Sequence, residues 1–285
     1  MSNAASVKSA RADEREYVLG THAEESVRLG LQHRLWSASA HQLWERAVVA
    51  PGQTVLDVGC GPGHASMDLA QIVGAGGRVL CVDESASYLH QVSDQAKAKR
   101  LDNVDRILGD VQELDTLLVD WSGRVDVAYA RWVLCFLRQP ERVIAGLARV
   151  VKPGGRVAIQ DYFNYETMTL APKRDEFSRV IRAVGRSFRD HGGNPDIMGV
   201  VPEMLARNGF KVTHLSLNQR VARPQDQIWH WPDSFWKVYV PRLVAGGFIN
   251  QHEADEFMTV WHEASASRDA FMFLPPVVDL IAVRT

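Results

Sequence analysis

The sequence predicts an α/β fold, in which a doubly wound, mostly parallel β-sheet is covered by helices on both faces. Between residues 53 and 161, short runs rich in valine and isoleucine alternate with stretches of helical spacing. This alternation is typical of parallel strands that are buried on both sides. The chain has 285 residues, of which 46% are hydrophobic and 23% are charged. Such a composition allows a sizeable core and excludes a disordered or fibrous chain.

Helices are expected before the first strand, between residues 21 and 50. Thr21 and Ser39 are each followed three residues later by a glutamate or a glutamine. This is the spacing of a capping box, in which two side chains satisfy orphan amides at the start of a helix. The sequence therefore predicts two N-terminal helices, one beginning at each capping residue.

The core strands are predicted at residues 55–58, 78–83, 104–109, 125–129 and 156–161. The helices between them are expected at residues 64–73, 85–100 and 140–152. Pro140 suits the first turn of the last of these helices, and Pro153-Gly154-Gly155 ends it.

After residue 161 the pattern becomes less regular. We expect helices at residues 172–189, 202–208, 233–245 and 250–267, and strands at residues 210–221 and 271–283. Asn250 and Glu253 form another capping-box pattern. Pro275-Pro276 falls inside the last predicted strand and has to lie at a bulge or an edge, because proline has no N–H to donate to the ladder.

The charge balance and the cysteine pattern exclude several classes of protein. There are 32 Lys and Arg against 34 Asp and Glu, a net charge of −2, which disfavours nucleic acid or an anionic membrane as a partner. Neither a signal peptide nor a membrane-spanning apolar run is found, so a cytoplasmic protein is expected. Cys60, Cys81 and Cys135 match neither a CxxC pair nor a disulfide framework, and no metal site is expected.

A glycine-rich turn, Gly59-Cys60-Gly61-Pro62-Gly63, follows the first strand. Such a turn lets a ligand approach the backbone closely at the carboxyl edge of the sheet. Asp57 would repel a pyrophosphate there, and Pro62 lacks an N–H that a phosphate would need. Both features disfavour a nicotinamide-dependent oxidoreductase. An acidic turn with few donors suits a cationic ligand, and S-adenosylmethionine, with its ammonium and sulfonium groups, fits.

With these residues the sequence resembles the class I S-adenosylmethionine-dependent methyltransferases, whose fold is a Rossmann-like sheet of seven strands with a helical lid. Four segments carry the resemblance, in the family's order: Val55 to Gly63, Val82-Asp83-Glu84-Ser85, Gly109-Asp110-Val111, and Ala148 to Val157. The match covers roughly residues 50 to 165. It implies one methyltransferase domain overall, with helical cover at 1–50, a cofactor-binding core at 51–165, and the completed sheet with its lid at 166–285.

The resemblance also implies roles for individual residues. Gly59 and Gly61 would line the methionine portion, with Asp57 near its ammonium group. Asp83 would accept hydrogen bonds from both ribose hydroxyls, and Glu84 follows it in the acidic motif. Further cofactor-binding candidates are Asp110 for the adenine amino group, Val111 for a ring nitrogen, and the backbone of Arg131 for the methionine amino group. Asp110 could alternatively be a helix cap.

Aromatic residues are candidates for the substrate side. Trp132, Trp229 and Trp236 would form walls for an organic acceptor, and Tyr17 would close the site from the N-terminal segment. Each ring could equally serve only in packing. Candidates for a proton acceptor are Asp161, His191 and His230, with Tyr162 beside Asp161. In-line displacement from a sulfonium needs positioning more than a strong base.

The resemblance therefore implies methyl transfer to an O, N or C nucleophile of a small organic molecule, by a monomer or homodimer. Quinone-precursor and secondary-metabolite methyltransferases are the nearest resemblances. Enzymes that methylate base amines carry an Asn/Asp-Pro-Pro-Tyr-like turn after the fourth strand, and here that turn reads Ala130-Arg131-Trp132-Val133. An RNA or protein methyltransferase, or a protein that binds S-adenosylmethionine without catalysis, remains the alternative.

Overall fold

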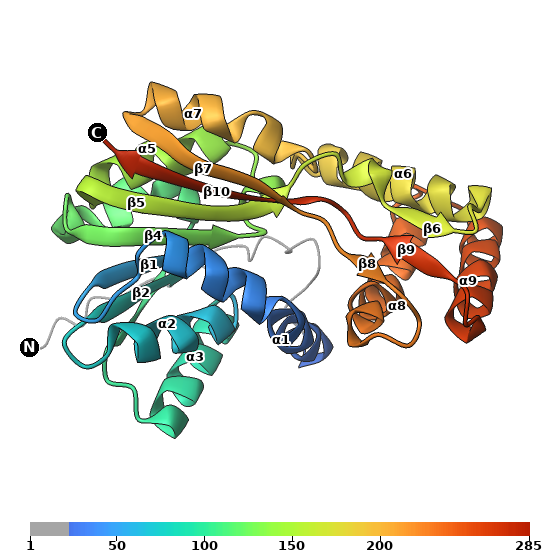
Figure 1. Cartoon of the computed structure of the whole chain (residues 1–285), viewed down its shortest axis with the longest axis horizontal. Helices are drawn as coiled ribbons and strands as arrows, with labels where there is room; N and C mark the ends of the chain where they lie inside the picture. Colours follow the sequence, from blue (N-terminus) through green and yellow to red (C-terminus); the bar gives the residue numbers. More distant parts are fainter. Residues whose placement is uncertain (1–22) are drawn as a thin grey trace, which may run out of the picture.

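The computed structural model describes residues 23–285, and its main feature is a seven-stranded sheet with the order β3-β2-β1-β4-β5-β10-β7 (Figure 1). The strands are β1 (Thr54–Val58), β2 (Arg78–Asp83), β3 (Val104–Leu108), β4 (Val125–Arg131), β5 (Val151–Tyr162), β7 (Phe210–Asn218) and β10 (Val277–Arg284). Strand β10 runs antiparallel to both of its neighbours, and the other pairs are parallel. The predicted fold class is therefore confirmed.

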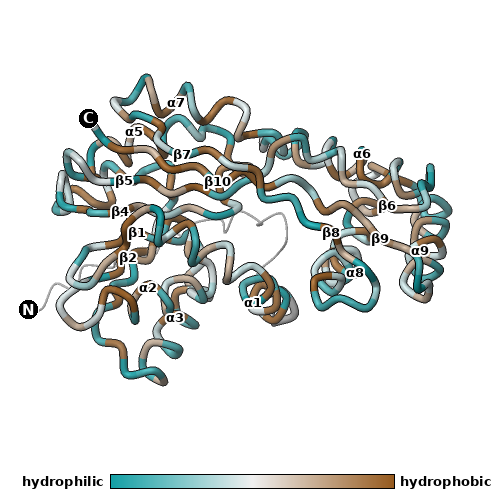
Figure 2. The backbone as a smooth tube through the Cα atoms, in the orientation of Figure 1, coloured by the Kyte–Doolittle hydropathy of each residue, from teal (hydrophilic) through white to brown (hydrophobic). Residues whose placement is uncertain are grey.

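Helices cover both faces of this sheet (Figure 1). On one face lie α1 (Ala23–Arg46), α2 (His64–Val73) and α3 (Ala86–Lys99), and on the other lie α4 (Leu114–Leu117), α5 (Pro140–Val150) and α7 (Val201–Arg207). Long stretches of the central strands are brown, that is apolar (Figure 2). Leu56 and Val55 pack into separate hydrophobic clusters on opposite faces, as the alternation of side chains along a strand requires.

A single helix, α1, runs where two helices are predicted. Ser39 lies inside α1 and does not cap a helix. Its hydroxyl accepts hydrogen bonds from the side chains of Gln160 in β5, at 2.7 Å, and Asn218 in β7. These bonds occupy the oxygen that a capping box would use, and they join α1 to the sheet. Thr21, the other predicted cap, lies outside the described residues.

A second, three-stranded sheet with the order β6-β9-β8 lies beyond the carboxyl edge of the large one. It consists of β6 (Thr169–Ala171), β8 (Val221–Ala222) and β9 (Phe271–Phe273), packed with α6 (Asp175–Asp190), α8 (His230–Ala245) and α9 (Gln251–Ala266). We call these six elements the outer lobe.

Two predicted strands are each divided between the two sheets. The predicted strand 271–283 is wrong as one element, because Pro275-Pro276 separates β9 in the small sheet from β10 in the large one. Proline cannot continue the ladder, so the chain changes sheets there. Likewise, the run predicted at 210–221 forms β7 and β8.

The outer lobe has an aromatic core of its own. Phe177, Trp236, Phe257 and Trp261 are all buried, and the rings of Phe177 and Phe257 stack with centroids 5.7 Å apart. The predicted capping box of Asn250 with Glu253 is present at the start of α9. Within residues 23–285, no helix is both long enough and apolar enough to cross a membrane.

Candidate cofactor and substrate site

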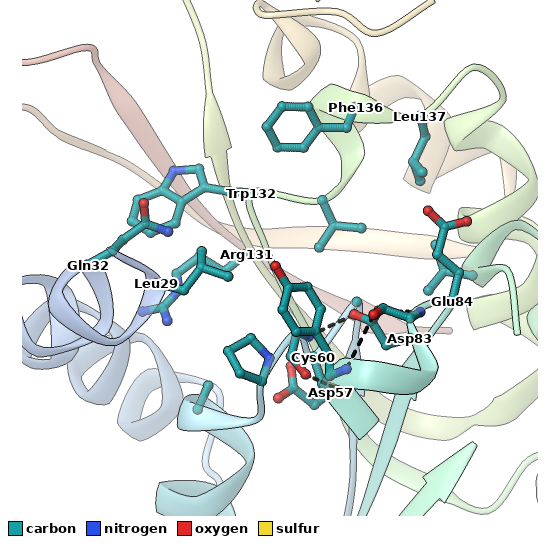
Figure 3. A pocket seen from close by; sticks show the side chains of 18 of the residues that line it. Leu29, Gln32, Asp57, Cys60, Asp83, Glu84, Arg131, Trp132, Phe136 and Leu137 are labelled. Atoms are coloured by element: carbon teal, nitrogen blue, oxygen red, sulfur yellow. Dashed lines mark hydrogen bonds between the residues drawn. The ribbon is translucent and has the colours of Figure 1, made fainter. Parts of the chain in front are cut away.

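A cavity of about 1220 Å³ opens at the carboxyl ends of β1, β2 and β4 and extends to α8 of the outer lobe (Figure 3). Its volume exceeds the roughly 300–1,000 Å³ of a pocket for one drug-sized ligand. One part is lined by acidic side chains from the strand ends, and the other by aromatic side chains from the end of β4, β5, α6 and α8. We call these the acidic part and the aromatic part.

The glycine loop forms the floor of the acidic part. Gly59 has φ +63°, and a Cβ there would lie 2.7 Å from a methyl carbon of Val133, so only glycine fits. Gly61 has φ +55°, and no atom lies within 4 Å of the Cβ position. The loop therefore presents an open stretch of backbone to a ligand.

Asp57 lies beneath this loop and is 3% exposed. The hydroxyl of Ser66 donates a hydrogen bond of 2.6 Å to one of its oxygens. Burial raises the pKa of Asp57 to about 6, although Ser66 and the positive charge of Arg131 counteract the effect. Because burial destabilises the charged form of this carboxylate, a cation that binds beside it stabilises that form.

Asp83 connects the glycine loop to the start of α3. Its two carboxylate oxygens accept backbone hydrogen bonds from Gly61, at 2.8 Å, and from Ser85, at 2.9 Å. Burial raises the pKa of Asp83. Each oxygen has a second lone pair, so the carboxylate can still accept the two hydroxyls of a ribose. Figure 3 shows Asp83 opposite Arg131 across the cavity.

The other predicted cofactor contacts, Glu84, Asp110 and Val111, also line the acidic part. Asp110 accepts a hydrogen bond of 2.8 Å from the Gln112 amide and so caps a short 3-10 turn. Both interpretations of Asp110 are therefore compatible, because a capping carboxylate keeps acceptor capacity.

Arg131 lies between the acidic and the aromatic parts. Its guanidinium donates to the Nδ1 atom of His33, at 3.0 Å, and stands over the ring of Trp132 at 5.1 Å from the centroid. Two further lining residues, His33 from α1 and His64 from α2, were not predicted from the sequence. No local motif marks them, because His33 meets Arg131 from a segment far away in the chain and His64 stacks on His33, with ring centroids 5.9 Å apart.

The aromatic part contains two of the predicted wall residues, Trp132 and Trp236. Trp132 stacks near Trp231, with centroids 5.6 Å apart, and near Tyr162, at 6.1 Å. The prediction for Trp229 is wrong, because that ring lies outside the cavity and stacks on Trp261 at 4.5 Å. Other residues that line this part are Tyr165, Met168, Phe188, Trp231 and Phe235.

The candidates for a proton acceptor are separated by the structure. Asp161 does not line the cavity; its oxygens accept the amides of Cys135, at 3.2 Å, and Tyr162, at 2.9 Å. Burial raises its pKa to about 6. His230 is exposed at the start of α8, also away from the cavity. These two predictions are corrected accordingly, whereas His191 and Tyr162 do line the aromatic part. Tyr17 lies outside the described residues.

The residues of the acidic part fit S-adenosylmethionine. The open Gly61 backbone leaves room for the methionine portion, Asp57 is a buried carboxylate for a cation, and Asp83 has acceptor capacity for two hydroxyls. Among residues 23–285 no three His, Cys, Asp or Glu side chains gather as metal ligands would.

Comparisons with known proteins identify a methyltransferase domain. Residues 50–187 match a family described as a methyltransferase domain. The arsenite methyltransferase of Halobacterium salinarum is 36% identical over 115 residues, which are 40% of this chain and 28% of the relative. The trans-aconitate 2-methyltransferase of Deinococcus radiodurans is 32% identical over 162 residues, which are 56% of this chain and 58% of the relative. The chain thus spans about a quarter to three-fifths of the length of these curated relatives.

The crystal structure of a putative methyltransferase from Bacillus halodurans shares the fold, with a TM-score of 0.58 and 18% identity over 85% of this chain and 97% of that one. The family match, the glycine loop and the carboxylates at the strand ends together place the domain formed by residues 50–187 in the class I S-adenosylmethionine-dependent methyltransferases.

Proposed function

We propose that this protein transfers a methyl group from S-adenosylmethionine to a small organic molecule. The observation that carries the proposal is the cavity of about 1220 Å³, in which an acidic part adjoins an aromatic part. Two ligands of different chemistry can lie end to end in such a space. An aromatic wall with few polar groups suits an organic acceptor.

Residues of the acidic part would hold the cofactor. Asp57 would pair with the ammonium group, Asp83 would accept the ribose hydroxyls, and Asp110 with the Val111 amide would contact the adenine. When bound, the cofactor supplies a methyl group on an electrophilic sulfonium. The protein's contribution is to hold the acceptor nucleophile in line with that methyl group and to exclude water, and such alignment is worth up to about 7–11 kcal/mol.

The aromatic part would bind the acceptor. Trp132 and Phe235 supply apolar surface, with the fully buried Trp236 packed against Phe235 at 5.0 Å between ring centroids. His191 is the lining residue best suited to accept a proton. Its Nδ1 atom lies 2.6 Å from the Ser187 carbonyl oxygen, so Nδ1 carries the proton and Nε2 is left as an acceptor. Two relatives, by their names, act on arsenite and on trans-aconitate, and both are small molecules.

The division of the chain would then follow the cavity. Residues 51–165 would form the cofactor-binding core, residues 1–50 its helical cover, and residues 166–285 the rest of the sheet with the lid over the acceptor. A cytoplasmic location and a monomeric or homodimeric state remain predictions from the sequence.

A methyl-transfer assay tests the proposal. The protein would be incubated with S-adenosylmethionine and a panel of phenols, amines, carboxylic acids and quinone precursors, and release of S-adenosylhomocysteine would be measured. Turnover of at least one small acceptor is expected. Binding of the cofactor without turnover of any acceptor would favour a non-catalytic protein. Turnover of RNA or protein, but of no small molecule, would favour an RNA or protein methyltransferase. Thermal stabilisation by NAD but not by S-adenosylmethionine would overturn the assignment.

Phe235→Ala is expected to raise the KM of the acceptor about tenfold or more and to leave the Kd of S-adenosylmethionine unchanged. Phe235 lines the aromatic part and is half-buried, and loss of a large apolar contact is worth roughly 1.5–3 kcal/mol. Steady-state kinetics and calorimetry would measure the two constants. Phe271→Ala is the matched control, because that ring is in the outer lobe but outside the cavity. An equal loss of cofactor affinity in Phe235→Ala would contradict the role.

A further inference from the structure

We propose that Arg131 binds the carboxylate at the amino-acid end of S-adenosylmethionine, and that His33 and Asp68 hold Arg131 in position. The inference rests on the proposed function and extends it. It assigns the Arg131 side chain a ligand, and it assigns a role to two residues that no motif marks.

The first observation is an unsatisfied donor on Arg131. One terminal nitrogen, Nη2, donates to His33, but the other, Nη1, is buried and has no hydrogen-bond partner within the described part of the chain. Arg131 also lines the cavity. A buried guanidinium donor without a partner is costly, more so than a neutral one. A ligand oxygen in the cavity would satisfy it.

The second observation is a chain of hydrogen bonds behind Arg131. Because an arginine only donates, the Nδ1 atom of His33 accepts from Arg131 and the ring proton is on Nε2. That Nε2 atom lies 3.0 Å from a carboxylate oxygen of Asp68. His33 is 9% exposed, so the bond between Arg131 and His33 is largely sheltered from water, whereas the Asp68 side chain is 27% exposed and also contacts His41. The arrangement restrains the guanidinium from rotating and leaves Nη1 available to a ligand.

The position of Asp57 indicates that the carboxylate bound by Arg131 belongs to an α-amino acid. In the sheet, Asp57 of β1 is paired with Tyr129 of β4, and Arg131, two residues further, has its side chain on the same face. The positive charge of Arg131 lowers the pKa of Asp57. Among the ion pairs of residues 23–285, however, none is formed between these two side chains. An α-amino acid carries an ammonium and a carboxylate on one carbon. Asp57 and Arg131 together complement that pair of charges, which the methionine portion of the cofactor supplies.

The test compares two cofactors by calorimetry. Decarboxylated S-adenosylmethionine keeps the ammonium, the sulfonium and the nucleoside but lacks the carboxylate. The unmodified protein is expected to bind S-adenosylmethionine about ten- to a hundredfold more tightly than the decarboxylated form, because a hydrogen bond to a charged group is worth about 1.5–3 kcal/mol. Arg131→Met is expected to abolish this difference by weakening S-adenosylmethionine alone. His33→Leu and Asp68→Asn are expected to reduce the difference several-fold.

The control is Arg34→Met, which removes a cation next to His33 in α1 that does not line the cavity; the difference is expected to persist. Retained binding of the decarboxylated cofactor shows that each variant is folded, and Arg131→Lys keeps the charge if the methionine variant fails to fold. Two results for Arg131→Met would overturn the inference. One is an equal loss of affinity for both cofactors. The other is unchanged affinity for both, which would indicate that Arg131 binds a carboxylate of the acceptor instead. Failure of the unmodified protein to bind either cofactor would instead overturn the proposed function.

Discussion

Replacing Asp57 by asparagine is expected to stabilise the ligand-free protein and, at the same time, to weaken binding of S-adenosylmethionine. Burial raises the pKa of Asp57 from 3.8 to about 6. At pH 7 the charged carboxylate therefore destabilises the folded state by up to about 3 kcal/mol, at 1.36 kcal/mol per pKa unit. The asparagine side chain would keep an acceptor for the Ser66 hydroxyl without that charge. It would lose the anionic partner of the cofactor's ammonium, and with it about ten- to a hundredfold in affinity.

The pH dependence of this effect follows from the direction of the pKa shift. Since the folded state has the higher pKa, it binds the proton first as the pH falls. The destabilisation by Asp57 is fully present above pH 6, decreases between pH 6 and pH 4, and is absent below the unfolded pKa of 3.8. Asp57→Asn should therefore exceed the unmodified protein in stability at pH 7 and equal it near pH 4. Cofactor binding by the unmodified protein should weaken below pH 6.

Urea unfolding at pH 7 and at pH 4 to 5, together with calorimetry over the same range, measures both effects. The control is Asp105→Asn, because Asp105 is an exposed carboxylate paired with Arg78 on the surface. A surface pair of this kind contributes little, so its variant should show neither the gain in stability nor the loss of affinity. If Asp57→Asn bound the cofactor as tightly as the unmodified protein, the assignment of the ammonium group to Asp57 would be wrong.

Asp83→Ala is expected to weaken cofactor binding by about ten- to a hundredfold. The variant loses the acceptors for the ribose hydroxyls, each hydrogen bond to a charged acceptor being worth about 1.5–3 kcal/mol. It also loses the bonds that hold the Gly61 and Ser85 amides, so the glycine loop is less well positioned. Both effects act in the same direction.

Methylthioadenosine separates this variant from Arg131→Met. The compound keeps the ribose and the adenine but has no amino-acid end. Asp83→Ala should weaken it as strongly as S-adenosylmethionine, whereas Arg131→Met should not affect it. Asp94→Ala, an exposed carboxylate on α3, serves as the control. Unchanged affinity of Asp83→Ala for both ligands would overturn its assignment to the ribose.

The parallel core could be predicted because its information is local. Each core strand is a short apolar run with its own turn signals. Strands β1 to β4 agree with the predicted bounds within two residues, whereas β5 contains the predicted run 156–161 but begins earlier, at Val151. The same local signals wrongly predicted that Ser39 caps a helix. Its oxygen instead accepts hydrogen bonds from Gln160 and Asn218, which lie 121 and 179 positions away in the chain. The division of residues 271–283 between two sheets likewise depends on partners that are distant in the chain. Tertiary context, which no local pattern contains, decided both cases.

The candidate site shows the same limit. Asp57, Asp83 and Asp110 follow strands, and the carboxyl edge of a parallel sheet brings such residues together. The aromatic part is assembled from the end of β4, β5, α6 and α8, so its members share no spacing. Trp229 and Trp236 were equivalent in the sequence, yet only Trp236 lines the cavity. The difference depends on how α8 packs against α9.

The outer lobe is built from two separate stretches of chain, one between β5 and α7 and the other between β7 and β10. The chain therefore passes between the two sheets at several places (Figure 1). A lid made from one insertion can be exchanged between relatives as one contiguous segment. Here exchange of only one of the two stretches would combine α8 and α9 of one protein with α6 of another and leave mismatched rings at Phe177 and Trp236. Exchange of acceptor specificity by recombination would need both stretches together, so point substitutions in the aromatic part are the easier route to a new acceptor.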